Sequence, residues 1–257
     1  MDTATHTVPF VPAQCGGWPF LDDDHAPQRL LTAAACVRLA RRDGPHPVPH
    51  PDDLATVLDP GEALRIRALD LPRPLPTGTL TPQQQAAIRA TVDVIAHLVP
   101  LWAPLLMALP LTYLPMPAGR ASVSASCFAW PQHILFADTA FDDPAVLAEQ
   151  TLHETFHQWL YLCEELTPLQ QPCCTQRVTL PSGTSGRSPA ELLGAAHVTC
   201  GLARLWPLLD VPGPVRDRRL SHLAAYTRGC RGLIADNRPY FTADGHALAD
   251  RILEATS

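Results

Sequence analysis

The residues with the clearest potential for chemistry form the sequence His153-Glu154-Thr155-Phe156-His157, an H-E-x-x-H pattern. Helical residues four apart lie on the same face, so both imidazoles can bind one metal ion with Glu154 beside them. The neighbouring residues are largely apolar, and burying these polar groups there costs free energy unless a metal or a partner compensates. The pattern therefore predicts a metal site, with a chance match or a pair of packed core histidines as the alternative.

A catalytic metal site also needs a third protein ligand and an open coordination position. His197 lies among small and apolar residues of a later predicted helix, and Glu191 lies near the start of that helix. We expect His197 to be the third ligand, because its helix follows the motif helix and Glu191 has a competing role in capping; a packed core histidine is the alternative. Three imidazoles suit Zn(II) as well as Fe(II), whereas two histidines and a carboxylate are typical of non-heme iron.

The elements that must position these residues are mainly helices. Asp143 and Pro144 predict the start of a long helix that carries the motif to about Leu166, and Ser188 with Glu191 forms a capping box for a helix to about Leu205. Further helices are expected at residues 28–42, 83–98, 215–236 and 242–255, and strands at residues 121–128 and 132–137. The expected fold class is α+β, predominantly helical, with a zincin-like core and a small sheet preceding the HExxH helix.

Composition bounds the domain organisation. The chain has 257 residues, 46% of them hydrophobic, and 28 prolines that predict many helix starts and rigid loops. We expect an irregular, Pro-rich helical part over residues 1–80 and a metal-binding catalytic domain over residues 81–257, either separate or as one continuous domain.

Charge and hydropathy exclude several classes of protein. The net charge is −6 and the 19 basic residues are all arginine, so a nucleic-acid partner, a P-loop lysine and a Schiff-base lysine are not expected. Residues 94–119 carry no Asp, Glu, Lys or Arg, but five prolines and His97 interrupt them, which favours a buried core over a membrane span. The N-terminus has no basic region followed by an apolar one, so we expect a cytoplasmic protein and no membrane partner.

Longer segments around the motif resemble the HExxH-motif peptide-modification proteins, which are regarded as 2-oxoglutarate-dependent peptide β-hydroxylases. The resemblance covers residues 115–206 and rests on four segments: 122–128, 143–169, 187–197 and 203–205. After the motif, the family pattern reads R-x-P…G-x-x-H, and here Ser188 separates Arg187 from Pro189.

The resemblance implies an oxidoreductase, a dioxygenase of natural-product biosynthesis. In this case His153, His157 and His197 hold Fe(II), 2-oxoglutarate chelates two open positions and O₂ takes another. The substrate is a residue of a ribosomally synthesised precursor peptide, hydroxylated at its β-carbon. The iron and the cosubstrate carry the chemistry, and the protein positions them.

A carboxylate of 2-oxoglutarate needs a fixed cation, and in a chain without lysine this cation must be an arginine. Arg187 and Arg204 flank the helix that carries His197. Arg187 is the first choice, because it lies in the loop that enters the site, and a solvated surface arginine is the alternative.

The substrate peptide is expected to bind extended along residues 122–137, since the edge of a strand can pair with a peptide backbone. Ser124 and Ser126 leave space for the peptide, while Trp130 and His133 could form pocket walls. The competing interpretation is that the small residues pack against the motif helix and the peptide enters over residues 167–187.

Two further functions stay open on ligand chemistry alone. In a zinc metallopeptidase, Glu154 is the general base that activates water for peptide hydrolysis. A catalytically silent peptide-binding protein would keep the helix pair without turnover. The sequence defines no oligomeric state.

Overall fold

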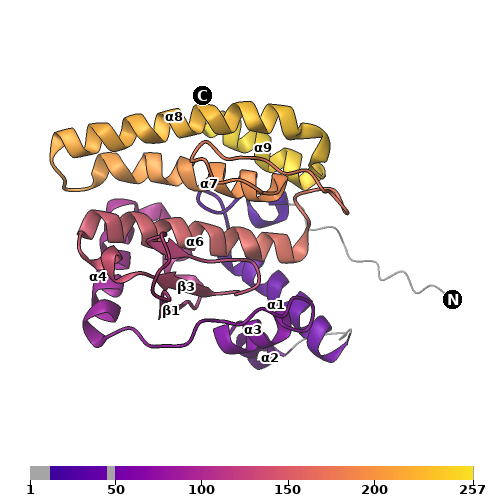
Figure 1. Ribbon diagram of the computed structural model, residues 1–257. Helices are drawn as coiled ribbons and strands as arrows, with labels where there is room; N and C mark the ends of the chain where they lie inside the picture. Colours follow the sequence, from indigo (N-terminus) through magenta and orange to yellow (C-terminus); the bar gives the residue numbers. More distant parts are fainter. Residues whose placement is uncertain (1–11, 45–49, 257) are drawn as a thin grey trace.

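The computed structural model describes residues 12–44 and 50–256, and most of them are helical (Figure 1). Its α-helices are α1 (Pro27–Asp43), α2 (Pro51–Val57), α3 (Pro60–Arg67), α4 (Pro82–Leu98), α5 (Ala103–Ala108), α6 (Pro144–Leu166), α7 (Pro189–Leu205), α8 (Gly213–Asn237) and α9 (Ala243–Ala255). Short 3-10 helices are η1 (Pro12–Cys15), η2 (Pro100–Trp102), η3 (Asp138–Phe141), η4 (Trp206–Leu208) and η5 (Arg238–Tyr240).

Proline sets the start of most helices. Six of the described α-helices begin with proline as their first residue: α1, α2, α3, α4, α6 and α7. Proline fits this position because its missing N–H would have no partner in the first turn. Thr81 and Asp143 cap α4 and α6 with their side chains, and the start of α6 at Asp143 and Pro144 is the one that the sequence predicts.

A small sheet precedes α6, in agreement with the expected α+β class. Its strands are β1 (Thr112–Pro115), β2 (Ser124–Ala125) and β3 (His133–Phe136), in the order β1-β3-β2. β1 pairs with β3 in parallel, and β2 pairs with β3 antiparallel, with Ser124 opposite Phe136. The two expected strands are thus neighbours, while β1 lies in a segment whose sequence indicated only buried core.

The layers place α6 at the centre. In Figure 1, α8, α7, α6 and the sheet follow one another from top to bottom. Helices α1 to α3 lie below the C-terminal end of α6. Leu30 and Leu31 of α1 belong to the same buried core as Phe156 and Trp159 of α6. The N-terminal part and the motif helix therefore share one hydrophobic core.

A buried ionic cluster ties α1 and α3 to α6. Arg38 donates to both carboxylate oxygens of Glu165, at 2.9 and 2.8 Å, and Arg67 reaches the same carboxylate at 3.1 Å. Arg38 also donates to the side-chain oxygen of Gln132, next to β3. Each charge in this cluster has a close partner, which buried charges require.

Within the described ranges, none of the helices has the length and apolar character needed to cross a membrane.

Candidate metal centre

His153 and His157 lie one turn apart on α6 and line the same cavity, whose volume is about 730 Å³. Their ring centroids are 4.9 Å apart. The opposite face of α6 carries Leu152, Phe156 and Trp159, which are fully buried in the core. The expectation that the two imidazoles share one face of a helix is confirmed, and the apolar face explains why this helix holds its position.

The environment of His157 favours its neutral form. Burial lowers the pKa of His157 well below its usual range, and the nearby His153, His197 and Arg187 lower it further. Gly194 of α7 packs against this ring, because a Cβ at that position would lie 3.5 Å from Nδ1 of His157. A neutral imidazole is the form that binds metal ions, so His157 is ready to act as a ligand.

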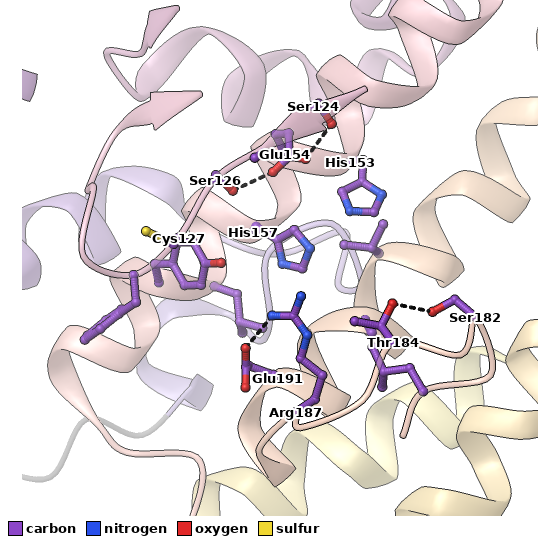
Figure 2. Close-up of a pocket in the computed structure, with 18 of the residues that line it drawn as sticks. Ser124, Ser126, Cys127, His153, Glu154, His157, Ser182, Thr184, Arg187 and Glu191 are labelled. Carbon is purple, nitrogen blue, oxygen red and sulfur yellow. Dashed lines mark hydrogen bonds and ion pairs between the residues drawn. The ribbon is translucent and has the colours of Figure 1, made fainter. Parts of the chain in front are cut away.

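Glu154 points away from the two imidazoles toward the sheet (Figure 2). Ser124 Oγ donates to Oε1 at 2.6 Å, and Ser126 Oγ donates to Oε2 at 2.5 Å. Hydrogen bonds to both oxygens stabilise the carboxylate and fix its orientation. Both serines line the cavity as expected, but their hydroxyl groups are engaged with Glu154, so only their backbone and the space above them face a ligand.

Arg187 lies across the cavity from the imidazoles, and its guanidinium group points toward His157 (Figure 2). The backbone of Arg187 is fixed by two hydrogen bonds with Val178, at 2.8 and 3.1 Å. Its side chain donates to Glu191 at 2.7 Å and remains about half exposed. An arginine held in this way keeps donors available for an anionic ligand.

Glu191 is committed to other partners. One of its oxygens accepts from Arg187, and the other accepts from the backbone N–H of Ser188 at 2.8 Å, which completes the predicted capping box. Burial raises the pKa of Glu191, but these hydrogen bonds and the charge of Arg187 outweigh burial and lower it. These contacts favour the structural role that the sequence suggested for this residue.

The structure does not bring His197 into the cavity. The residues of α7 that line it follow one stripe: Ala190, Glu191, Gly194, Ala195, Val198, Thr199 and Leu202. His197 lies on the core side, where its ring packs 4.8 Å from that of Phe156 and its Nε2 donates to Pro19 O at 2.8 Å. Burial lowers the pKa of His197 to about 4, and its Nδ1 has no hydrogen-bond partner. This position differs from the one expected of a third ligand.

Three other expected site residues also lie outside the cavity lining. Arg204 donates to Phe20 O at 3.2 Å and lies over the ring of Trp102. Trp130 is buried beside the sheet and donates to Arg73 O, and the ring of His133 interacts with Pro131 O at 2.7 Å. Of the two candidate arginines, only Arg187 faces the imidazoles, and the expected pocket walls belong to the packing of the sheet.

The cavity contains polar residues that sequence reasoning missed. They come from α6, from the loop before α7 and from α8: Tyr161, Glu164, Ser182, Thr184, Arg219, His222 and Tyr226. Tyr161 and Glu164 follow His157 at helical spacing, so the periodicity of α6 could have identified them. The residues of α8 had no such signal, because their approach depends on the packing of three helices.

The donor set fits a metal ion in part. Two imidazoles with a shared face and an adjacent cation suit a metal with an anionic ligand. Within residues 12–44 and 50–256, no three His, Cys, Asp or Glu side chains form a ready cluster around one point. Comparison with known protein families and with curated proteins finds no match for this sequence.

Proposed function

We propose that this protein is an Fe(II)- and 2-oxoglutarate-dependent hydroxylase that acts on the β-carbon of a residue in a ribosomally synthesised precursor peptide. The observation that carries this proposal is the meeting of His153 and His157 with the guanidinium group of Arg187 in one cavity. A metal site beside a fixed arginine suits a cosubstrate that binds a metal and carries a second carboxylate. The resemblance of residues 115–206 to the peptide β-hydroxylases supports the same reaction.

Each residue of the site has a proposed role in this reaction. His153 and His157 would hold Fe(II), and Arg187 would bind a carboxylate of 2-oxoglutarate. When bound, the iron and its cosubstrate supply the oxidation of a C–H bond to C–OH by O₂, with 2-oxoglutarate converted to succinate and CO₂. Glu154, held by Ser124 and Ser126, keeps the N-terminal half of the motif docked on the sheet.

The peptide has a plausible path along β2. In the order β1-β3-β2, β2 is an edge strand, and residues on both of its sides line the cavity, among them Ser122 and Phe128. An edge strand leaves backbone groups free to pair with an extended chain. An edge strand beside the motif helix also supports a zincin-like core. If the substrate is a peptide made on ribosomes, a cytoplasmic location follows for the enzyme.

A zinc metallopeptidase is the second candidate, and the H-E-x-x-H spacing favours it. In that reaction Glu154 must take a proton from water. Both oxygens of Glu154 accept hydrogen bonds from serine hydroxyl groups, and the carboxylate turns toward the sheet and away from the imidazoles, an orientation unlike that of a base beside a metal-bound water (Figure 2).

The test is a reconstitution of protein purified without oxygen. We expect Fe(II)-loaded protein given 2-oxoglutarate and O₂ to form succinate, and a bound peptide substrate to gain the mass of one oxygen atom. His157→Ala should abolish both, because it removes a metal ligand. Cleavage of a peptide that requires Zn(II) and ignores 2-oxoglutarate would favour the peptidase and contradict the proposal.

A further inference from the structure

The cavity offers few uncommitted donors for a third metal ligand. Besides the two imidazoles, the histidine, cysteine and carboxylate side chains that line it are Cys127, Glu154, Glu164, Glu191 and His222, and burial raises the pKa of the tyrosines Tyr161 and Tyr226, which disfavours their phenolate forms. Both oxygens of Glu154 and both oxygens of Glu191 already accept hydrogen bonds. Burial raises the pKa of the Cys127 thiol, so its metal-binding thiolate form is disfavoured.

Glu164 is poorly placed for the pair. It lies seven residues after His157 on α6, which corresponds to about 10 Å along the helix axis. Burial and the nearby Glu191 raise its pKa to about 8, which favours the protonated form that binds metals weakly. His222 of α8 is the remaining donor, and the described residues give its side chain no hydrogen bond or ion pair.

Contacts at two levels show how α8 runs past α6. At one level, Arg219 of α8 forms an ion pair with Glu149 of α6, with Nε to Oε2 at 2.7 Å. At the next level, Tyr226 of α8 is close to Ser182 and Arg187, and Arg187 is close to His157 of α6. The two helices therefore run in the same direction along the cavity, from the Arg219–Glu149 level to the Tyr226–His157 level.

His222 and His153 occupy the level between these contacts. His222 lies about 4.5 Å beyond Arg219 along α8, and His153 lies about 6 Å beyond Glu149 along α6. Arg219, His222 and Tyr226 all line the cavity, so His222 belongs to the stripe of α8 that faces it. At the preceding turn, the ion pair of Arg219 and Glu149 spans the distance between α8 and α6. Two imidazoles joined through an ion about 2 Å from each nitrogen span a similar gap.

We infer that His222 is the third protein ligand of the metal centre, in place of His197. The inference rests on the proposed metal site at His153 and His157. The imidazole of His222 is exposed at the rim, and it turns toward the pair when the metal binds. The ligand set is then three histidines from two helices, α6 and α8, so metal binding locks α8 against α6 across the cavity.

The test uses Co(II) as a probe with the full chain under anaerobic conditions. Equilibrium dialysis gives the Kd, and the visible absorption of bound Co(II) reports its coordination. We expect His222→Ala to raise the Kd at least about tenfold and to change the Co(II) spectrum, because losing a ligand costs no less than losing a supporting residue. His222→Asp should restore much of the affinity, since a carboxylate can take the same coordination position.

Controls separate the possible outcomes. His97→Ala, at another exposed helical histidine far along the sequence on α4, should leave Kd and spectrum unchanged. Unaltered binding by His222→Ala, together with lost binding by His157→Ala, would overturn the assignment of His222 and leave the metal site standing. Loss of binding in a folded His197→Ala protein, with His222→Ala unaffected, would return the third position to His197. Stoichiometric Co(II) in His153→Ala and His157→Ala would remove the proposed metal site altogether.

Discussion

Two neighbouring carboxylates on α6 have opposite environments. Glu165 faces the interior, where burial raises its pKa but the hydrogen bonds and charges of Arg38 and Arg67 outweigh burial and lower it. Glu164 faces the cavity, where burial and Glu191 raise its pKa to about 8, and the described residues give it no hydrogen bond. Two consecutive residues of α6 thus differ in charge state: Glu165 is an anion with charged partners, and Glu164 favours its protonated form.

The difference separates structural polar groups from those available for chemistry. In the Glu165 cluster, both oxygens of the carboxylate accept from Arg38 and one of them also lies 3.1 Å from Arg67, so the role of the cluster is to stabilise the fold. On the cavity side, Glu164, His157 and part of Arg187 have capacity left for a ligand. Groups with perturbed pKa values in a cavity are typical of functional sites.

The largest effect should come from breaking the structural cluster. Arg38→Met removes the guanidinium group that binds both oxygens of Glu165, and leaves that buried carboxylate with Arg67 alone. We expect the free energy of unfolding in urea to fall by about 3–5 kcal/mol. Arg65→Ala is the control, because its ion pair with Glu62 is at the surface and should contribute little to stability. Equal stability of the two variants would contradict a structural role for the Arg38 cluster.

A smaller effect, on ligand binding instead of stability, is expected on the cavity side. Arg187→Met should raise the Kd of 2-oxoglutarate for the anaerobic Fe(II) protein by roughly 10- to 100-fold, because a charged hydrogen bond is worth about 1.5–3 kcal/mol. Its free energy of unfolding should change little, since the Arg187–Glu191 pair is half exposed. Arg204→Met serves as the matched variant outside the cavity. A weaker affinity in Arg204→Met, with Arg187→Met unaffected, would transfer the carboxylate site to Arg204.

The smallest effect concerns the proton on Glu164. The folded pKa is about 8 and the ordinary value is 4.5, so the folded protein keeps a proton that the unfolded chain releases. The free energy of unfolding should therefore fall as the pH rises from about 4.5 to 8. Glu164→Gln should reduce this fall by about 1 kcal/mol, a value kept small by water in the cavity.

Urea unfolding of Glu164→Gln at pH 5 and pH 8 checks this expectation. Glu254→Gln, at an exposed carboxylate of α9, should keep the pH dependence of the unaltered protein. If Glu164→Gln shows the same pH dependence as Glu254→Gln, Glu164 is ionised in the folded protein and the contrast with Glu165 fails.

Sequence signals within a few residues of each helix end were enough to predict the helices that carry the site. Capping residues and prolines set the starts of α4, α6 and α7, and the spacing of His153 and His157 placed them on one face. The role of His197 depended on information that is not local, since its partner Pro19 lies 178 residues away in the sequence. Periodicity could not show which side of α7 faces the cavity, because α7 is apolar on most sides and packs against α6, α8 and α9.

The segment that covers His197 also constrains how the chain completes its fold. Phe20 stacks on Phe156 at 4.0 Å, and Arg251 of α9 donates to Asp22 at 2.6 Å across 229 residues of sequence. At about 5–20 residues per second, the ribosome needs roughly 10 to 50 s to deliver Arg251 after Asp22. The ion pair between this segment and α9 therefore forms only after the last helix has been made. Phe20 lacks its stacking partner only until Phe156 emerges, so the aromatic contact can form before the ion pair with α9 does.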